Sequence, residues 1–71
     1  MSDVPSDATD DVRRWRHGLR NELNIITMAT AAALGLIDHG ASIEQVRENL
    51  VRATNACRRC HDLLQEWPDR D

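Results

Sequence analysis

The stretch DHGASIEQ, residues 38–45, ends one helical segment and begins another. Gly40 suits the left-handed conformation that commonly closes the C-terminus of a helix. Ser42 stands three residues before Gln45, and this spacing is the capping-box signature of a helix N-terminus. The stretch therefore predicts a short turn between two helices.

Apolar residues recur at helical spacing on both sides of this turn. Before it, the sequence places Val12, Trp15, Leu19, Leu23, Ile26, Thr30, Ala33 and Ile37. After it, spacings of three and four alternate through Ile43, Val46, Leu50, Ala53, Cys57, Cys60, Leu64 and Trp67, as in a heptad seam. We expect helices over about residues 9–38 and 43–67, with a flexible tail at 1–8 and a C-terminal tail at 68–71.

Two helices joined by a short connection predict an all-α fold, an antiparallel helical hairpin. A chain of 71 residues gains little stability from its own core. A hairpin also covers only part of two wide apolar stripes. We therefore expect a homodimer in which two hairpins form a four-helix bundle.

Composition and charge narrow the classes of function. The acidic, polar start MSDVPSDATDD lacks the apolar core of a secretory signal, and two cysteines fit a cytoplasmic protein with reduced thiols. No apolar run approaches the length of a membrane span. A net charge of −3 argues against a dedicated nucleic-acid binder. We expect a cytoplasmic protein that binds neither membrane nor nucleic acid.

A histidine stands on the side of the first helix opposite its apolar stripe. On a helical wheel, His17 shares this outer side with Arg13, Arg20, Asn21, Asn24 and Met28. An exposed imidazole can act as a nucleophile or proton carrier near neutral pH. Arginines beside it would stabilise a bound phosphoryl group and attract an acidic partner. Gly18 would let the backbone of a partner approach closely.

The segment HGLRNELN, residues 17–24, resembles the H-box of two-component sensor histidine kinases. That box lies on the first helix of the dimerisation and histidine-phosphotransfer domain. The resemblance implies that His17 is the phosphoacceptor and that Asn21 helps to position groups during phosphotransfer. It implies that Arg20 steadies the helix or its charge environment. Apart from the resemblance, we expect Arg13, Gly18 and Asn24, on the same outer side of the helix, to meet the partner.

The segment departs from the family pattern at two positions. Gly18 replaces the acidic residue that acts as general base in self-phosphorylation, and Glu22 replaces a proline that kinks the helix. Only WPDRD follows the second helix, so we expect no ATP site and no autokinase activity.

The resemblance then implies a stand-alone histidine phosphotransfer protein. It would exchange a phosphoryl group with the aspartate of a response-regulator receiver domain, and Mg²⁺ would reside in that receiver. The alternative is a non-catalytic dimerisation or regulatory module that docks on a histidine kinase or a receiver domain.

The predicted second helix contains another motif with a known chemical role. Cys57-Arg58-Arg59-Cys60-His61 matches the C-x-x-C-H signature of c-type haem attachment. Cys57, Cys60 and His61 could also hold zinc with one outside ligand. Both cysteines stand at seam positions, where a small apolar residue is suitable. We therefore expect buried reduced thiols, and no metal or cofactor bound by this chain.

Overall fold

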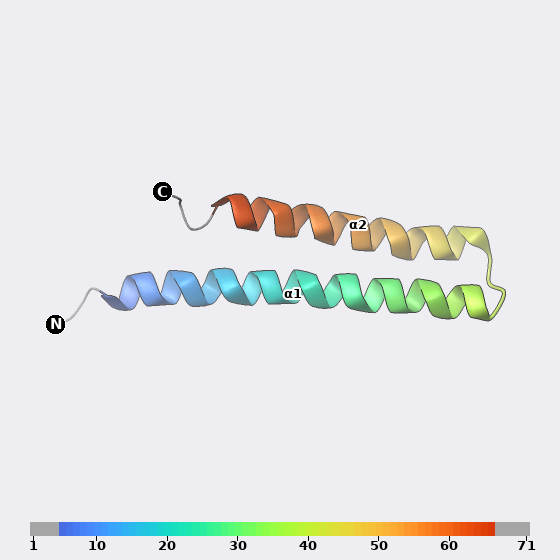
Figure 1. The fold of residues 1–71 in the computed structure, drawn as a ribbon, viewed down its shortest axis with the longest axis horizontal. Helices are drawn as coiled ribbons and strands as arrows, with labels where there is room; N and C mark the ends of the chain where they lie inside the picture. Colours follow the sequence, from blue (N-terminus) through green and yellow to red (C-terminus); the bar gives the residue numbers. More distant parts are fainter. Residues whose placement is uncertain (1–4, 67–71) are drawn as a thin grey trace.

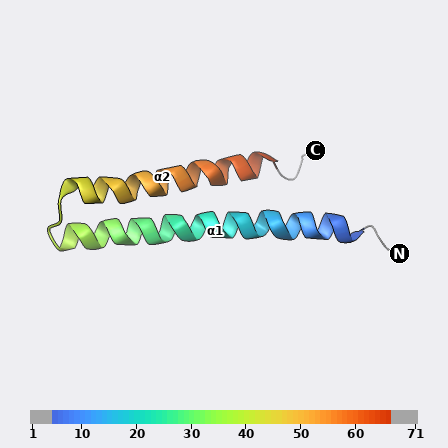
Figure 2. The same cartoon turned by 180° about the vertical axis from the view of Figure 1, so that it is seen from behind.

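The computed structural model is an antiparallel hairpin of two long helices (Figure 1). Helix α1 spans Pro5–Asp38 and helix α2 spans Ile43–Glu66. The structure describes the backbone of residues 5–66 and the side chains of residues 10–66. The two helices lie side by side along the whole of α2, also when seen from behind (Figure 2). The predicted all-helical hairpin is confirmed.

The predicted helix boundaries at the turn are correct, whereas α1 begins earlier than expected. Its first residue is Pro5 instead of a residue near 9, so residues 5–8 are helical and do not belong to a tail. Proline is compatible with the first turn of a helix because its missing N–H would have no intrahelical partner there. The rest of the predicted N-terminal tail, Trp67 and residues 68–71 lie outside the described residues.

Gly40 ends α1 as the sequence predicts. Its φ of 71° is left-handed. The amide of Ala41 donates to the carbonyl of Leu36 at 2.9 Å, and the amide of Gly40 donates to the carbonyl of Ile37 at 3.0 Å. These two bonds define a Schellman motif, which satisfies carbonyls that the helix itself leaves without partners.

Ser42 begins α2 in the predicted capping role. The amide of Gln45 donates to the Ser42 hydroxyl at 3.3 Å, and the amide of Val46 donates to the Ser42 carbonyl at 3.3 Å. The Gln45 side chain accepts a hydrogen bond from the same hydroxyl at 3.4 Å. The two caps therefore place the turn between the helices through local chemistry.

Two glycine substitutions should change stability in opposite directions. Gly40→Ala should lower the free energy of unfolding by about 1–2 kcal/mol, because alanine is strained in the left-handed conformation. Gly35→Ala should raise it by about 0.5–1 kcal/mol, because alanine favours the helix and an added Cβ would meet nothing within 4 Å. Urea unfolding measures both. A gain in stability for Gly40→Ala would contradict the capping role.

The seam between the helices follows one heptad register. Helix α1 contributes buried or half-buried side chains at Trp15, Leu19, Glu22, Ile26, Ala29, Ala33 and Leu36. Helix α2 contributes Val46, Asn49, Ala53, Ala56, Cys60 and Leu63. The least exposed side chains in the middle of this seam are alanines, which let two helix backbones approach closely.

Several residues predicted for the core lie outside this seam. Leu23 and Ile37 of α1 are exposed. So are Ile43, Leu50, Cys57 and Leu64, every second member of the predicted α2 seam. The apolar arc of each helix is wider than one partner helix can cover, and the hairpin covers the part that carries the alanines.

Two polar contacts join the helices near the open end of the hairpin. The indole N–H of Trp15 donates to the backbone carbonyl of Leu63 at 2.7 Å. The Arg59 Nε donates to the Glu22 Oε1 at 2.9 Å.

Within the described residues, neither helix is long and apolar enough to cross a membrane.

Candidate functional site

A shallow hollow of about 530 Å³ opens on α1, near the open end of the hairpin. It is lined by Asp10, Arg13, Arg14, His17, Gly18 and Asn21. These residues stand seven, four and three positions before His17, and one and four after it. This spacing gathers them on one side of a helix. The site is therefore built by α1 alone.

His17 is the histidine that the fold leaves available for chemistry. Its side chain is exposed, and no residue in the described part of the chain forms a hydrogen bond with its ring. By contrast, His39 Nδ1 donates to the carbonyl of Gly35 at 2.8 Å. His61 Nε2 accepts from the Gln65 amide at 3.2 Å. An imidazole whose nitrogens are both accessible can attack an electrophile.

Arg13 and Arg14 line the same hollow as the imidazole of His17. The Arg14 Nη1 lies 3.5 Å from the Asp11 Oδ1. Both side chains are largely exposed, so this ion pair restrains the arginine weakly. A guanidinium is always charged and offers planar paired donors that match phosphate oxygens. The hollow therefore combines an open nucleophile with donors for an oxyanion.

The structure brings together four of the predicted site residues: His17, Arg13, Gly18 and Asn21. Arg20 and Asn24 are exposed and do not line the hollow. Arg20 follows His17 by three residues, which turns it to the side away from Arg14.

Asp10 and Arg14 line the hollow although they were not among the predicted site residues. The sequence carried a signal for both. They precede His17 by seven and three residues, and these separations return to the same side of a helix. Asp10 adds one negative charge to a hollow that is otherwise basic.

Gly18 lies at the border between the hollow and α2. A Cβ at this position would lie 3.8 Å from the Leu63 Cδ1, which is an ordinary van der Waals contact. Packing within the hairpin therefore does not require glycine here. The absence of a side chain instead leaves open the surface immediately beside His17.

Glu22, the second departure from the H-box pattern, has a structural role. Its side chain is 18% exposed and pairs with Arg59, whose side chain is 50% exposed. The ion pair joins α1 to α2 one turn beyond Gly18. Sequence reasoning missed this role because Arg59 is distant along the chain. A proline at position 22 would remove the pair.

The three side chains of the C-x-x-C-H motif differ in exposure. Cys60 is buried in the seam, whereas Cys57 and His61 are exposed. The prediction that both cysteines face the seam is wrong for Cys57, because the hairpin uses Ala56 and Cys60 instead. Among the described residues, no group of three or more His, Cys, Asp or Glu side chains is placed to hold a metal ion.

Burial raises the pKa of the Cys60 thiol, and the nearby Glu22 carboxylate and Cys57 act in the same direction. Arg59 opposes the shift. Cys60 therefore stays protonated at neutral pH. Since the thiolate is the nucleophilic and metal-binding form, Cys60 is a packing residue in this hairpin.

A second hollow of about 270 Å³ lies between the helices, closer to the turn. It is lined by Ile25, Met28, Ala29, Ala32, Asn49 and Arg52. Met28 is 71% exposed at its edge. The second hollow therefore combines an apolar floor with one cationic side chain.

No family model matches the sequence, and no curated protein or solved structure shows detectable similarity to it. Support for a function comes from the geometry and chemistry of the His17 hollow.

Proposed function

We propose that this protein is a histidine phosphotransfer protein, which exchanges a phosphoryl group between His17 and a receiver-domain aspartate in the cytoplasm. The observation that supports this function is the open His17 ring in a hollow with Arg13 and Arg14. The H-box resemblance of residues 17–24 supplies the reaction class. The exposed position of the site suits a second protein that must bring its own acidic centre to the histidine.

The proposed reaction is a displacement at phosphorus. A nitrogen lone pair of the neutral His17 ring attacks the phosphorus atom of the aspartyl phosphate, and an N–P bond forms. The P–O bond to the aspartate breaks, and its electron pair leaves on the carboxylate. Arg13 and Arg14 stabilise the transferred phosphoryl oxygens, and Asn21 can donate its side-chain amide to them. The receiver contributes Mg²⁺. The reverse transfer follows the same path.

The proposed functional unit is a homodimer in which two hairpins form a four-helix bundle. The hairpin measures 60 × 21 × 12 Å, so it is one helix thick. Many large apolar side chains are exposed on it, including Leu34, Ile43 and Leu64. Small helical proteins commonly bury such surface by association.

The second candidate function is a module that docks on a histidine kinase or a receiver without chemistry. Gly18 favours this alternative, because it replaces the acidic residue that follows the histidine in the H-box pattern. The second hollow, with its apolar floor and Arg52, would also serve a docking partner. The two candidates differ in whether phosphorus becomes bonded to His17.

Incubation with phosphorylated receiver domains tests the proposed function. The protein should acquire a phosphoryl label that is stable in base and labile in acid, as expected of a phosphoramidate, while the receiver loses its own. Phosphorus NMR of the labelled protein identifies the N–P bond. Stable binding to a receiver without any transfer of label would instead support the docking module.

A further inference from the structure

A row of mainly exposed apolar side chains runs along each helix at intervals of seven residues. On α2 the row holds Ile43, Leu50, Cys57 and Leu64, all exposed. On α1 it holds the exposed Leu23 and Ile37, with the half-buried Thr30 between them, whose hydroxyl donates to the carbonyl of Ile26 in its own helix. Residues seven apart lie almost above one another on a helix. We call these seven residues the apolar stripe. It contains no charged residue.

Both rows lie on the same side of the hairpin. Ile25 and Ala32 of α1 and Arg52 of α2 each precede a seam residue by one, and together they line the second hollow. The side chains that precede seam residues therefore share one side. The members of the apolar stripe on α1 each follow a seam residue by one, as do those on α2 from Leu50 onward. A residue that follows a seam residue is turned away from the seam in the opposite sense to a residue that precedes one. The apolar stripe therefore lies on the side of the hairpin opposite the second hollow.

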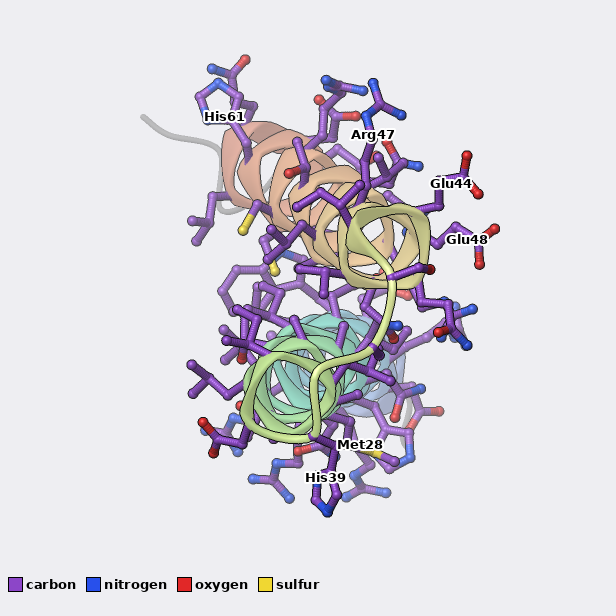
Figure 3. All side chains as sticks on the ribbon, turned by 90° about the vertical axis from the view of Figure 1, so that its right-hand side faces the viewer. Met28, His39, Glu44, Arg47, Glu48 and His61 are labelled. Carbon is purple, nitrogen blue, oxygen red and sulfur yellow. The ribbon has the colours of Figure 1, made fainter. Side chains whose placement is uncertain are left out.

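The register of the hairpin places the two rows level with each other. The Glu22–Arg59 ion pair fixes this register. It brings Leu23 within one residue of the level of Cys57, Thr30 within one residue of Leu50, and Ile37 within one residue of Ile43. Figure 3 looks along the hairpin: the left side shows mainly carbon, with His61 at its upper edge, whereas Glu44 and Glu48 lie on the right. The stripe is therefore a mainly apolar surface with a polar border, and Arg16, seven residues before Leu23, ends it on α1.

The exposed surface area of the hairpin exceeds that of a compact monomer by about the area that one partner buries in a dimer. A compact monomer of 8.1 kDa exposes about 4,500 Å². The hairpin exposes 5387 Å², an excess of roughly 900 Å² over that value. Each partner in a standard protein interface buries about 800 Å². Helices of a four-helix bundle also need one apolar row beside the two seam rows, and each helix here has one.

We infer that the apolar stripe is the surface on which a second copy of this chain packs, and that the His17 side of the hairpin stays open in the dimer. This inference rests on the homodimer of the proposed function and assigns its interface. His17, Gly18 and the second hollow lie on or next to the side that the second copy leaves uncovered. Each dimer then offers two separate phosphotransfer sites.

Matched charge substitutions test the interface assignment. Leu50→Glu places a carboxylate in the middle of the apolar stripe, and Met28→Glu places one at an exposed apolar position on the other side. Leu50 is already 46% exposed in the hairpin, so the hairpin itself tolerates the change. Sedimentation should give twice the 8.1 kDa chain mass for the unaltered protein and for Met28→Glu, and 8.1 kDa for Leu50→Glu. Circular dichroism shows whether each variant keeps its helices.

Thiol labelling of the unaltered protein gives an independent measurement. Cys57 should react with a maleimide at low protein concentration and become protected as dimers form, while the buried Cys60 stays unreactive throughout. A dimeric Leu50→Glu, or labelling of Cys57 that does not depend on concentration, overturns the assigned interface. A monomeric unaltered protein overturns the homodimer. Phosphotransfer from a receiver is measured separately on the same samples. Failure of the proposed function can therefore be distinguished from failure of the homodimer or of its assigned interface.

Discussion

Replacing His17 with glutamine should abolish the acid-labile phosphoryl label completely. Glutamine keeps a polar side chain at an exposed helical position, so the hairpin should fold unchanged. It has no nucleophilic nitrogen, because its amide lone pair is delocalised into the carbonyl. The measurement is transfer from a phosphorylated receiver domain, with circular dichroism and sedimentation as checks of fold and mass.

The two other histidines of the chain provide matched controls for this experiment. His39→Gln and His61→Gln remove imidazoles that are also exposed but are bonded to Gly35 and Gln65. Both variants should retain the label at the level of the unaltered protein. Label that persists in His17→Gln and disappears in either control would move the phosphoacceptor away from the hollow on α1.

The division into two helices could be predicted because its determinants are local. Gly40 and Ser42 specify the turn through bonds to residues within five positions of them, and the structure shows these bonds. The start of α1 could not be predicted in the same way. A proline reads as a break unless it stands in the first turn, and only the structure shows that Pro5 does.

The choice of seam could not be predicted from periodicity. Each helix carries an apolar arc that is wide enough for two neighbours, and spacing alone does not say which part meets the other helix. The hairpin covers the part with Ala29 and Ala56, where backbones can approach most closely. Leu23 and Leu50 remain exposed beside it. Close packing over small residues decided between alternatives that were equally apolar.

The candidate site was more predictable than the core because one helix builds it. The position of His17 relative to Arg13 and Asn21 follows from helical geometry. Glu22 was read only as a departure from a motif. Its partner Arg59 lies on the other helix, so its role depended on the register of the hairpin. Local geometry therefore predicted that His17, Arg13 and Asn21 share one side of α1, whereas the ion pair that joins this part of α1 to α2 depends on tertiary packing.

Enlarging the least exposed residue of the seam should destabilise the protein strongly. Ala56 is 0% exposed, and the register of the hairpin puts it level with the stretch of α1 between Glu22 and Ile26. Ala56→Leu adds a branched side chain to this contact without much change in helix propensity. The helices must separate or the new side chain must adopt a strained rotamer, and such overpacking costs about 1–3 kcal/mol. Urea unfolding at one fixed protein concentration measures this change, because dimerisation would otherwise alter the apparent stability.

Ala31→Leu is the matched control for Ala56→Leu. This substitution also replaces a helical alanine with leucine, but at an exposed position of α1. Its effect should stay within about 0.5 kcal/mol, as is usual for surface substitutions. A loss confined to Ala56→Leu shows that close approach at alanine positions holds the hairpin together. Equal effects of the two substitutions would show that the helices do not pack tightly at Ala56, and the seam assigned to α2 would then be wrong.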